Sequence, residues 1–349
     1  MSPRVIRRQD YSLSEEQLQL SKVFASLFER ESPSVRVRAA EPVGFDADLW
    51  QQLTGAGVIS MALPEAVGGD DATLVDLALV AEEFGRSMAP VPLIDAMTAA
   101  RLLAAVGAPE GVVRALAAGT KTATIALHPF HARERQLISS GAMADIVVGL
   151  DGDALVMSEG PPPAAVANLA CAPLAWRDLS TNDHTRSIVA EGLAAELAFA
   201  HAVLEWKALM AAAQTGIANG ARILASEYVT ERHAFGVPIG TFQAISHPIV
   251  DIAAGVEGAR RLALRAAWFL EHEPECALGD VLMAFVAASD VANRAASFGI
   301  HALGGLGFTL ESDMQLYFRR ARGWTLLAGD PQADLQQLGD HLYGPEPTH

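Results

Sequence analysis

Cysteine is scarce in this sequence: among 349 residues only Cys171 and Cys276 occur, and they are far apart. Two isolated thiols cannot build a disulfide framework, and they lie in no spacing typical of a thiolate zinc site. This usage is compatible with a reducing compartment. We therefore expect a cytoplasmic protein that is held together by its hydrophobic core.

Positive charge is also in short supply. The sequence has 25 Lys and Arg residues against 41 Asp and Glu residues, which gives a formal net charge of −16. A surface this acidic repels phosphate backbones, so nucleic acid is not expected as a partner. A ligand that carries phosphate would need a local cationic pocket.

Long uncharged apolar runs are missing as well. The first residues, MSPRVIRRQDYSLSEE, carry positive charges with no apolar segment behind them, so no signal peptide is expected. No stretch combines the length of a membrane span with freedom from charge. We expect neither secretion nor membrane insertion.

Aromatic residues make up only 6% of the chain, whereas hydrophobic residues make up 51%. A core that is mainly aliphatic is typical of helix-on-helix packing. The spacing of Ser12 and Glu15 matches a capping box, and apolar residues recur at helical spacing behind it. Further helical segments are predicted over 47–57, 73–87, 92–107 and 110–119. Residues 1–119 are therefore predicted to form an N-terminal α-helical domain.

The pattern changes at Thr120. Short β-branched segments separated by Gly, Asp and Pro predict a small β domain over 120–192. Helical periodicity then returns for about ten turns, and the interior glycines Gly216 and Gly220 indicate close packing between helices. Three further long helices and a short last one predict a four-helix bundle over 193–349. The expected fold is mainly α with a small β domain.

Two short stretches carry residues suited to a nucleotide. The first, RHAFGVPIGTFQ, covers 232–243 and follows a long helix. Arg232 offers a fork for phosphate oxygens, Phe235 a flat apolar face, Gly236 a close backbone approach and Gln243 an amide. These groups fit a dinucleotide. The alternative is a helix C-cap with an arginine favoured by the helix dipole.

The second stretch, GGLGFTLE, covers 304–311. It follows a helix and not a strand, so it is not the strand-to-helix dinucleotide fingerprint. Gly304, Gly305 and Gly307 nevertheless expose backbone N–H groups that are able to cradle a phosphate. The alternative is a tight connection between two helices.

The order and spacing of RHAFGVPIGTFQA, GGLGFTLE and RRAR resemble the acyl-CoA dehydrogenase family. PEAVGGDD and LALVAEEFGRSMAPVPL extend the resemblance over nearly the whole chain. It implies an α-helical N-terminal domain, a β-barrel-like middle domain and a C-terminal four-helix bundle. It also implies bound FAD, an acyl-CoA substrate, α,β-dehydrogenation and electron-transfer flavoprotein as the acceptor.

The resemblance also implies which residues meet the cofactor. By position, Arg232, Phe235 and Gln243 look like the residues that reach the adenosine-pyrophosphate half of FAD, usually across a subunit interface. The glycine pair 304–305 resembles the glycines beside the same cofactor. His301 stands where the family usually has Gln; it keeps the capacity for hydrogen bonding but changes the shape.

The catalytic base is where the sequence departs from the family. In the family a carboxylate removes the α-proton while the β-hydrogen leaves as hydride to the flavin. The usual position, 24 residues beyond the first glycine of the double-glycine motif, is Ala328 here, and the alternative position, 26 residues before Arg232, is Trp206. Asp330 and Glu205 are the nearby carboxylates, and each is a candidate base. The alternatives are a turn residue and a solvated helix position.

The middle region departs too, because TIALHPFHARERQ stands where the family usually has Thr-Glu-Pro and Gly-Ser beside the flavin ring. His128 and His131 have HxxH spacing, but no third ligand is evident and no metal site is predicted. We expect the flavin-ring side of the site to be incomplete in this chain.

These departures fall on one side of the expected site, because the nucleotide contacts are kept while the base and the ring contacts are not. LLAGDP and the short middle region resemble subunits of actinobacterial-type α2β2 acyl-CoA dehydrogenases that act on steroid side-chain thioesters. That resemblance implies a homologous partner subunit that supplies the base. The alternatives are a self-sufficient homomer that uses Asp330 or Glu205, a non-catalytic structural subunit, and a flavin oxidase or monooxygenase on the same fold.

Overall fold

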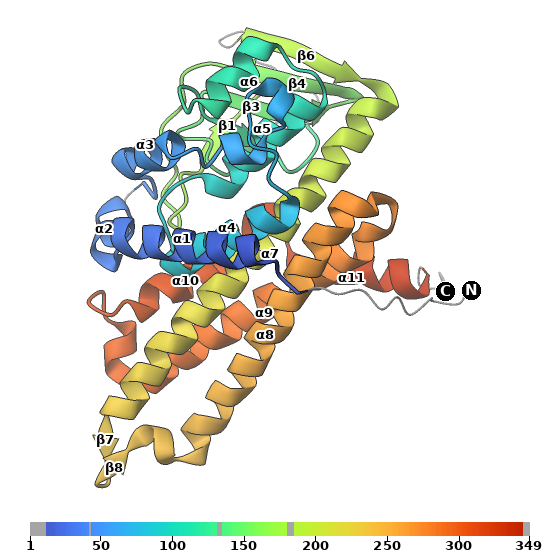
Figure 1. Ribbon diagram of the computed structural model, residues 1–349. Helices are drawn as coiled ribbons and strands as arrows, with labels where there is room; N and C mark the ends of the chain where they lie inside the picture. The colour runs from blue at the N-terminus through green and yellow to red at the C-terminus, as the bar shows by residue number, and fades with distance from the viewer. Residues whose placement is uncertain (1–11, 42, 131–134, 180–184, 345–349) are drawn as a thin grey trace.

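The computed structural model describes residues 12–41, 43–130, 135–179 and 185–344, and it places helices before and after a small β region (Figure 1). The N-terminal part is helical throughout. Its α-helices are α1 (Glu15–Glu31), α2 (Ser34–Ala40), α3 (Ala47–Gly55), α4 (Leu74–Ser87), α5 (Leu93–Ala105) and α6 (Glu110–Ala117).

The start of α1 differs from the prediction. The Ser14 side chain accepts a hydrogen bond from Gln17 N at 3.2 Å, and Gln17 Oε1 accepts one from Ser14 N at 3.1 Å. The capping box is therefore Ser14 with Gln17, and the predicted pair Ser12 with Glu15 was wrong by two residues. Both pairs match the motif, so spacing alone could not separate them. Helix α2, with seven residues, was not predicted because it is too short to show a period.

The β region forms one sheet of four strands in the order β1-β3-β4-β6. Within this sheet β1 and β3 pair in parallel, and the other two pairs of neighbours are antiparallel. A separate antiparallel pair, β2 with β5, was not predicted. The strands are β1 (Ala123–Ile125), β2 (Gln136–Ile138), β3 (Ile146–Asp151), β4 (Ala154–Glu159), β5 (Ala175–Arg177) and β6 (Thr185–Glu191).

The C-terminal part is a helical bundle built around the 40 residues of α7, a length of about 60 Å. This helix runs from the β region to the small β7–β8 hairpin at the far end of the molecule (Figure 1). The elements are α7 (Gly192–Glu231), β7 (His233–Ala234), β8 (Val237–Pro238), α8 (Gln243–His272), α9 (Ala277–Leu303), α10 (Met314–Thr325) and α11 (Pro331–Tyr343).

The predicted close packing at the glycines of α7 is present. A Cβ added to Gly216 would lie 1.9 Å from the Glu82 carbonyl oxygen of α4, and one added to Gly220 would lie 2.5 Å from the Tyr317 ring of α10. Real Cβ atoms do not approach so closely, so α4 and α10 reach α7 only because these positions are glycine.

One hydrophobic core runs from the N-terminal helices through the sheet into the bundle. At its centre the Phe84 ring of α4 stacks on the Trp324 ring of α10, with centroids 5.2 Å apart. The predicted fold class, helices followed by a small β region and a helical bundle, is confirmed. The domain limits at 119 and 192 stay an interpretation. Among the described helices, none has the length and hydropathy needed to cross a bilayer.

Candidate functional site

The tip of the α7–α8 hairpin presents the first set of predicted nucleotide contacts. Arg232 caps the C-terminus of α7, and its side chain has no hydrogen bond or ion pair to any other described residue. Phe235 has a φ of +54°, an uncommon backbone conformation for an aromatic residue, and its side chain is 97% exposed. Gly236 follows with a φ of +85°, and Gln243 begins α8. The tight turn therefore holds an aromatic ring out into solvent.

The second set lies at the C-terminus of α9. His301 is exposed in the last turn, and Gly304 ends the helix with a φ of +59°. A Cβ added to Gly304 or Gly305 would meet no atom within 4 Å, so the backbone here is open. Because α8 returns from the tip and α9 follows it, α7 and α9 end on the same side of the bundle (Figure 1).

These residues fit the diphosphate and the adenosine of FAD in their chemistry. An unpaired guanidinium matches an anionic diphosphate, and an exposed ring offers a surface for an apolar or aromatic group. Among the described residues, no hydrogen bond or ion pair joins the α7–α8 tip to the end of α9. The arrangement is that of a protrusion and not of a closed pocket, so a nucleotide here would need a second surface.

Asp330 lies in the connection between α10 and α11. Its side chain caps α11 by accepting a hydrogen bond from Gln332 N at 2.9 Å, and it is exposed. It borders a groove of about 440 Å³ between α9 and the α10–α11 connection, with Ser289 and Asn293 in the wall. Both of these residues carry a buried oxygen without a partner, Ser289 Oγ and Asn293 Oδ1, among the described residues.

The β region reaches the same connection. A Cβ on Gly329 would lie 3.5 Å from Cε1 of His128. His128 therefore faces the segment next to Ala328, one of the two positions where the sequence resemblance predicts a base. His131 lies outside the described residues. Within the described ranges no group of three or more His, Cys, Asp and Glu side chains is arranged to hold a metal ion.

Glu205 is buried in an ion-pair cluster between α5 and α7. Its carboxylate accepts two hydrogen bonds of 3.0 Å from Arg101 and lies 3.2 Å from His201 Nε2. Only 4% of the residue is exposed. Burial alone raises the pKa of Glu205, but the hydrogen bond from His201 and the charge of Arg101 outweigh burial and leave the pKa below its ordinary value. A carboxylate held in this way is a weak proton acceptor.

A third carboxylate, Asp95 of α5, escaped the sequence reasoning. It accepts hydrogen bonds from Trp206 Nε1 at 2.7 Å, from Ser139 Oγ at 2.6 Å and from Ser140 Oγ. Burial raises the pKa of Asp95, and the three hydrogen bonds act in the opposite direction. The available signal was one Asp inside the apolar run LIDAMTAARLLAA, where a buried acid needs partners from elsewhere.

This cluster borders a small cavity where the three parts of the chain meet. Met210, one turn beyond Trp206, and Leu327, next to Ala328, are both in its wall. The cavity therefore lies near both positions where the sequence resemblance predicts a base. Its volume is about 40 Å³. That space holds a few water molecules and no acyl chain. Among the described residues in its wall, Asp95 is the single carboxylate.

Two family models match this chain, one over the N-terminal helices and one over the C-terminal bundle. Residues 14–118 match the family model for the acyl-CoA dehydrogenase N-terminal domain, and residues 197–343 match the model for the C-terminal domain. Acyl-CoA dehydrogenase IpdE2 of Mycolicibacterium smegmatis is 31% identical over 343 residues, which cover 95% of this chain and 100% of that protein.

Two solved structures have folds that match this chain over nearly its full length. The Tcur3481-Tcur3483 steroid ACAD variant is 26% identical with a TM-score of 0.81, and the match covers 95% of this chain and 98% of that one. The ChsE4-ChsE5 complex from Mycobacterium tuberculosis shares the fold with a TM-score of 0.83 at 23% identity, over 98% and 100% of the two chains.

Proposed function

Because this chain belongs to the acyl-CoA dehydrogenase family, we propose that it works as one subunit of an FAD-dependent enzyme that introduces an α,β double bond into an acyl-CoA thioester. In this proposal a related partner chain supplies the catalytic base in an α2β2 assembly. The observation that carries this proposal is which residues occupy the two positions where the family resemblance predicts a base. One is the buried indole of Trp206 and the other is Ala328, beside a cavity too small for an acyl group.

Removal of an α-proton needs a carboxylate that is free to accept it within hydrogen-bonding distance. Glu205 is held by Arg101 and His201, and Asp95 is held by three donors. Neither side chain can turn toward a substrate without leaving donors unpaired in the core, which is costly. These contacts support a chain that does not carry the base itself.

The same proposal assigns the hairpin tip and the end of α9 to FAD. Members of this family bind FAD, which accepts the β-hydrogen as hydride. Arg232 would hold the diphosphate, with Phe235, Gly236 and Gln243 beside the adenosine. His301 and the glycine pair 304–305 would line the other side. Their exposure on a protrusion supports a cofactor shared with a partner chain.

A steroid-derived thioester is the proposed substrate class, and electron-transfer flavoprotein the proposed acceptor. The steroid class is supported by the similarity to the Tcur3481-Tcur3483 steroid ACAD, and the pairing of two chains by that protein and by the ChsE4-ChsE5 complex. The acceptor is proposed from the family resemblance alone. We propose that this chain assembles in the same way with a homologous chain.

The test is to purify this chain alone and together with homologous chains encoded next to it. We expect flavin absorbance and acyl-CoA-dependent bleaching only in the complex. Arg232→Leu should remove bound flavin from the complex, while Arg294→Leu, on the exposed side of α9, should not. Flavin and full turnover in the chain alone would refute the heteromeric assignment. A complex without flavin would leave a structural subunit as the function.

Asp330 supports a second candidate function, the self-sufficient homomer. Of the two candidate bases predicted from the sequence, Asp330 is the exposed one. It borders a groove in which two buried oxygens have no partner among the described residues. If the chain alone is active, Asp330→Asn should abolish turnover while the helix cap is kept, because Asn also caps helices. Unchanged turnover in that variant would exclude Asp330 as the base.

A further inference from the structure

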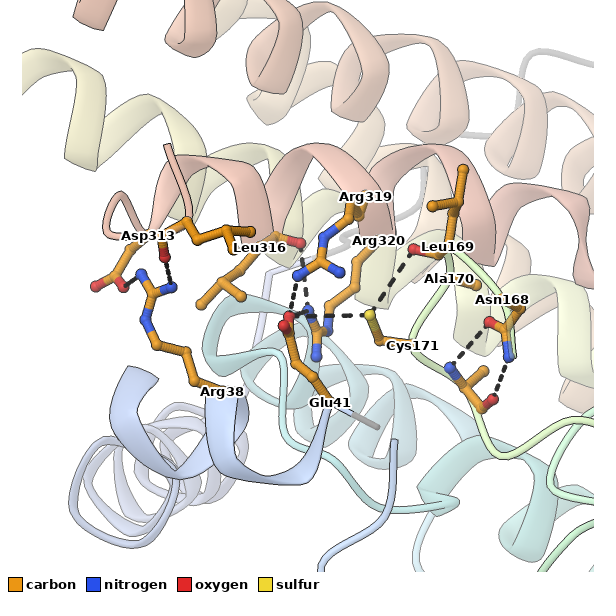
Figure 2. Close-up of polar contacts among 12 residues, drawn as sticks. Arg38, Glu41, Asn168, Leu169, Ala170, Cys171, Asp313, Leu316, Arg319 and Arg320 are labelled. Atoms are coloured by element: carbon orange, nitrogen blue, oxygen red, sulfur yellow. Dashed lines mark hydrogen bonds and ion pairs between the residues drawn. The ribbon is translucent and has the colours of Figure 1, made fainter. Parts of the chain in front are cut away.

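A cluster of charged side chains joins α2 to α10 (Figure 2). Arg38 of α2 pairs with Asp313 at 2.5 Å, and Arg319 of α10 pairs with Glu41. Arg320, the next residue on α10, points between Glu41 and the thiol of Cys171 (Figure 2). These contacts connect segments that are more than 270 residues apart in the sequence.

Arg320 is almost completely buried, with 1% of the residue exposed. Its Nη1 donates to the Leu316 carbonyl oxygen at 3.4 Å and lies 3.7 Å from Glu41 Oε1. Its Nε and Nη2 have no partner among the residues that the structure describes. These two nitrogens form one edge of the guanidinium, the fork that binds two oxygens of a carboxylate or phosphate side by side.

The charges around Arg320 do not balance. Three guanidiniums, those of Arg38, Arg319 and Arg320, face the two carboxylates of Glu41 and Asp313. Arg319 Nε is a further buried donor without a partner in the described chain. Glu41 is shared between Arg319 and Arg320, and a buried charge that is only partly compensated is destabilising. The group that is missing is an acceptor with negative charge.

Cys171 does not supply that charge. Its Sγ lies 3.8 Å from Glu41 Oε1, and burial raises the pKa of the thiol despite the nearby guanidiniums of Arg320 and Arg319. The thiol therefore stays protonated near neutral pH and leaves the free edge of Arg320 without a counter-ion.

We propose that the Nε and Nη2 edge of Arg320 binds a small oxyanion with two adjacent oxygens, such as a carboxylate or inorganic phosphate. The anion would enter past Arg38, Glu41 and Arg319, whose side chains are 26%, 21% and 24% exposed. By balancing the charge of Arg320 it ties α2 to α10. It is a structural ligand that acts independently of the proposed catalytic function.

The test measures thermal unfolding of the protein against sodium formate and, in a separate series, sodium phosphate, with NaCl holding the ionic strength constant. We expect a saturating rise of roughly 3–5 °C in Tm when the anion is about 100-fold above its Kd. Arg320→Lys keeps the charge without the fork and should lose most of the rise. The control Arg322→Lys, on the same helix but exposed, should keep it. If Tm rises in only one of the two series, that series identifies the bound anion as a carboxylate or as a phosphate.

Crystals soaked in selenate provide a readout that does not depend on variants. We expect an anomalous peak within hydrogen-bonding distance of Arg320 Nε and Nη2. Water molecules alone along that edge would overturn the proposal. An equal Tm rise in Arg320→Lys and in the wild type would do the same.

Discussion

The burial of Glu205 predicts that this residue stabilises the fold. Glu205→Gln removes the negative charge and leaves Arg101, whose side chain is 24% exposed, without its partner. Breaking a buried ion pair by removing one member costs about 3–5 kcal/mol. We therefore expect the free energy of unfolding to fall by about 3 kcal/mol, because partial exposure of Arg101 allows some water to replace the carboxylate.

Urea unfolding followed by circular dichroism measures this change. The exposed pair Arg114 with Glu110, whose side chains are 68% and 64% exposed, offers a matched control. Glu110→Gln should change stability by about 0.5 kcal/mol or less. Replacing both members of the buried pair, with Arg101→Met and Glu205→Leu, should cost less than Glu205→Gln alone, because no charge is then left unpaired.

The pH dependence provides a second check. Because the pKa of Glu205 is lowered in the folded state, its contribution is complete above the unfolded value of about 4.3. The contribution is lost as the pH falls from there through the lower folded pKa. The wild type and Glu205→Gln should therefore differ most near neutral pH and converge in acid. A Gln variant with wild-type stability but no turnover in the active assembly would refute the structural role and restore Glu205 as a base.

Three further predictions follow from the core contacts. Trp206→Ala should cost about 3–5 kcal/mol of stability by opening a cavity and by leaving Asp95 with one donor fewer, as measured by urea unfolding; a cost under 1 kcal/mol, the range typical of surface changes, would contradict its burial. The pKa of Asp95 is raised in the folded state, so its contribution to stability is complete below the unfolded pKa of about 3.9. That contribution is lost as the pH rises from there through the folded pKa. The free energy of unfolding of the wild type, measured relative to Asp95→Asn, should therefore decline between these two pKa values. In a buffer without oxyanions, Arg320→Met should leave stability unchanged or raise it by about 1–4 kcal/mol, whereas a loss above 2 kcal/mol would show that Arg320 is already compensated.

Much of the fold was readable from local pattern. The helical segments of the N-terminal part and the bundle have apolar residues at helical spacing. Strand β3 starts with a β-branched run, and an Asp-Gly-Asp turn separates it from the apolar start of β4. Short elements such as α2 and the β2–β5 pair escaped because three to seven residues do not show a period. The glycines of α7 predicted close approach, but which helices approach them was visible only in the structure.

The predicted nucleotide contacts and the predicted base candidates differ in how far the sequence sets their surroundings. Arg232, Phe235 and Gly236 lie within five residues on one turn, so their local sequence sets their geometry. Glu205 depends on Arg101, 104 residues away, and Trp206 depends on Asp95, 111 residues away. No local period encodes such pairs, which arise when α5 packs against α7.

The amino-acid sequence by itself determined that Trp206 and Ala328, neither of them acidic, stand at the two positions where the family resemblance predicts a carboxylate. It also determined that an arginine, an aromatic residue and a glycine pair follow the long helices. Side-chain type and helical order are local properties, and they need no folded partner. Only the tertiary structure decided that Glu205 is paired with Arg101, that Asp95 accepts a hydrogen bond from Trp206, and that the cavity lined by Asp95 is small. Burial, and with it the cost of moving a charge, exists only once distant segments exclude water from one another.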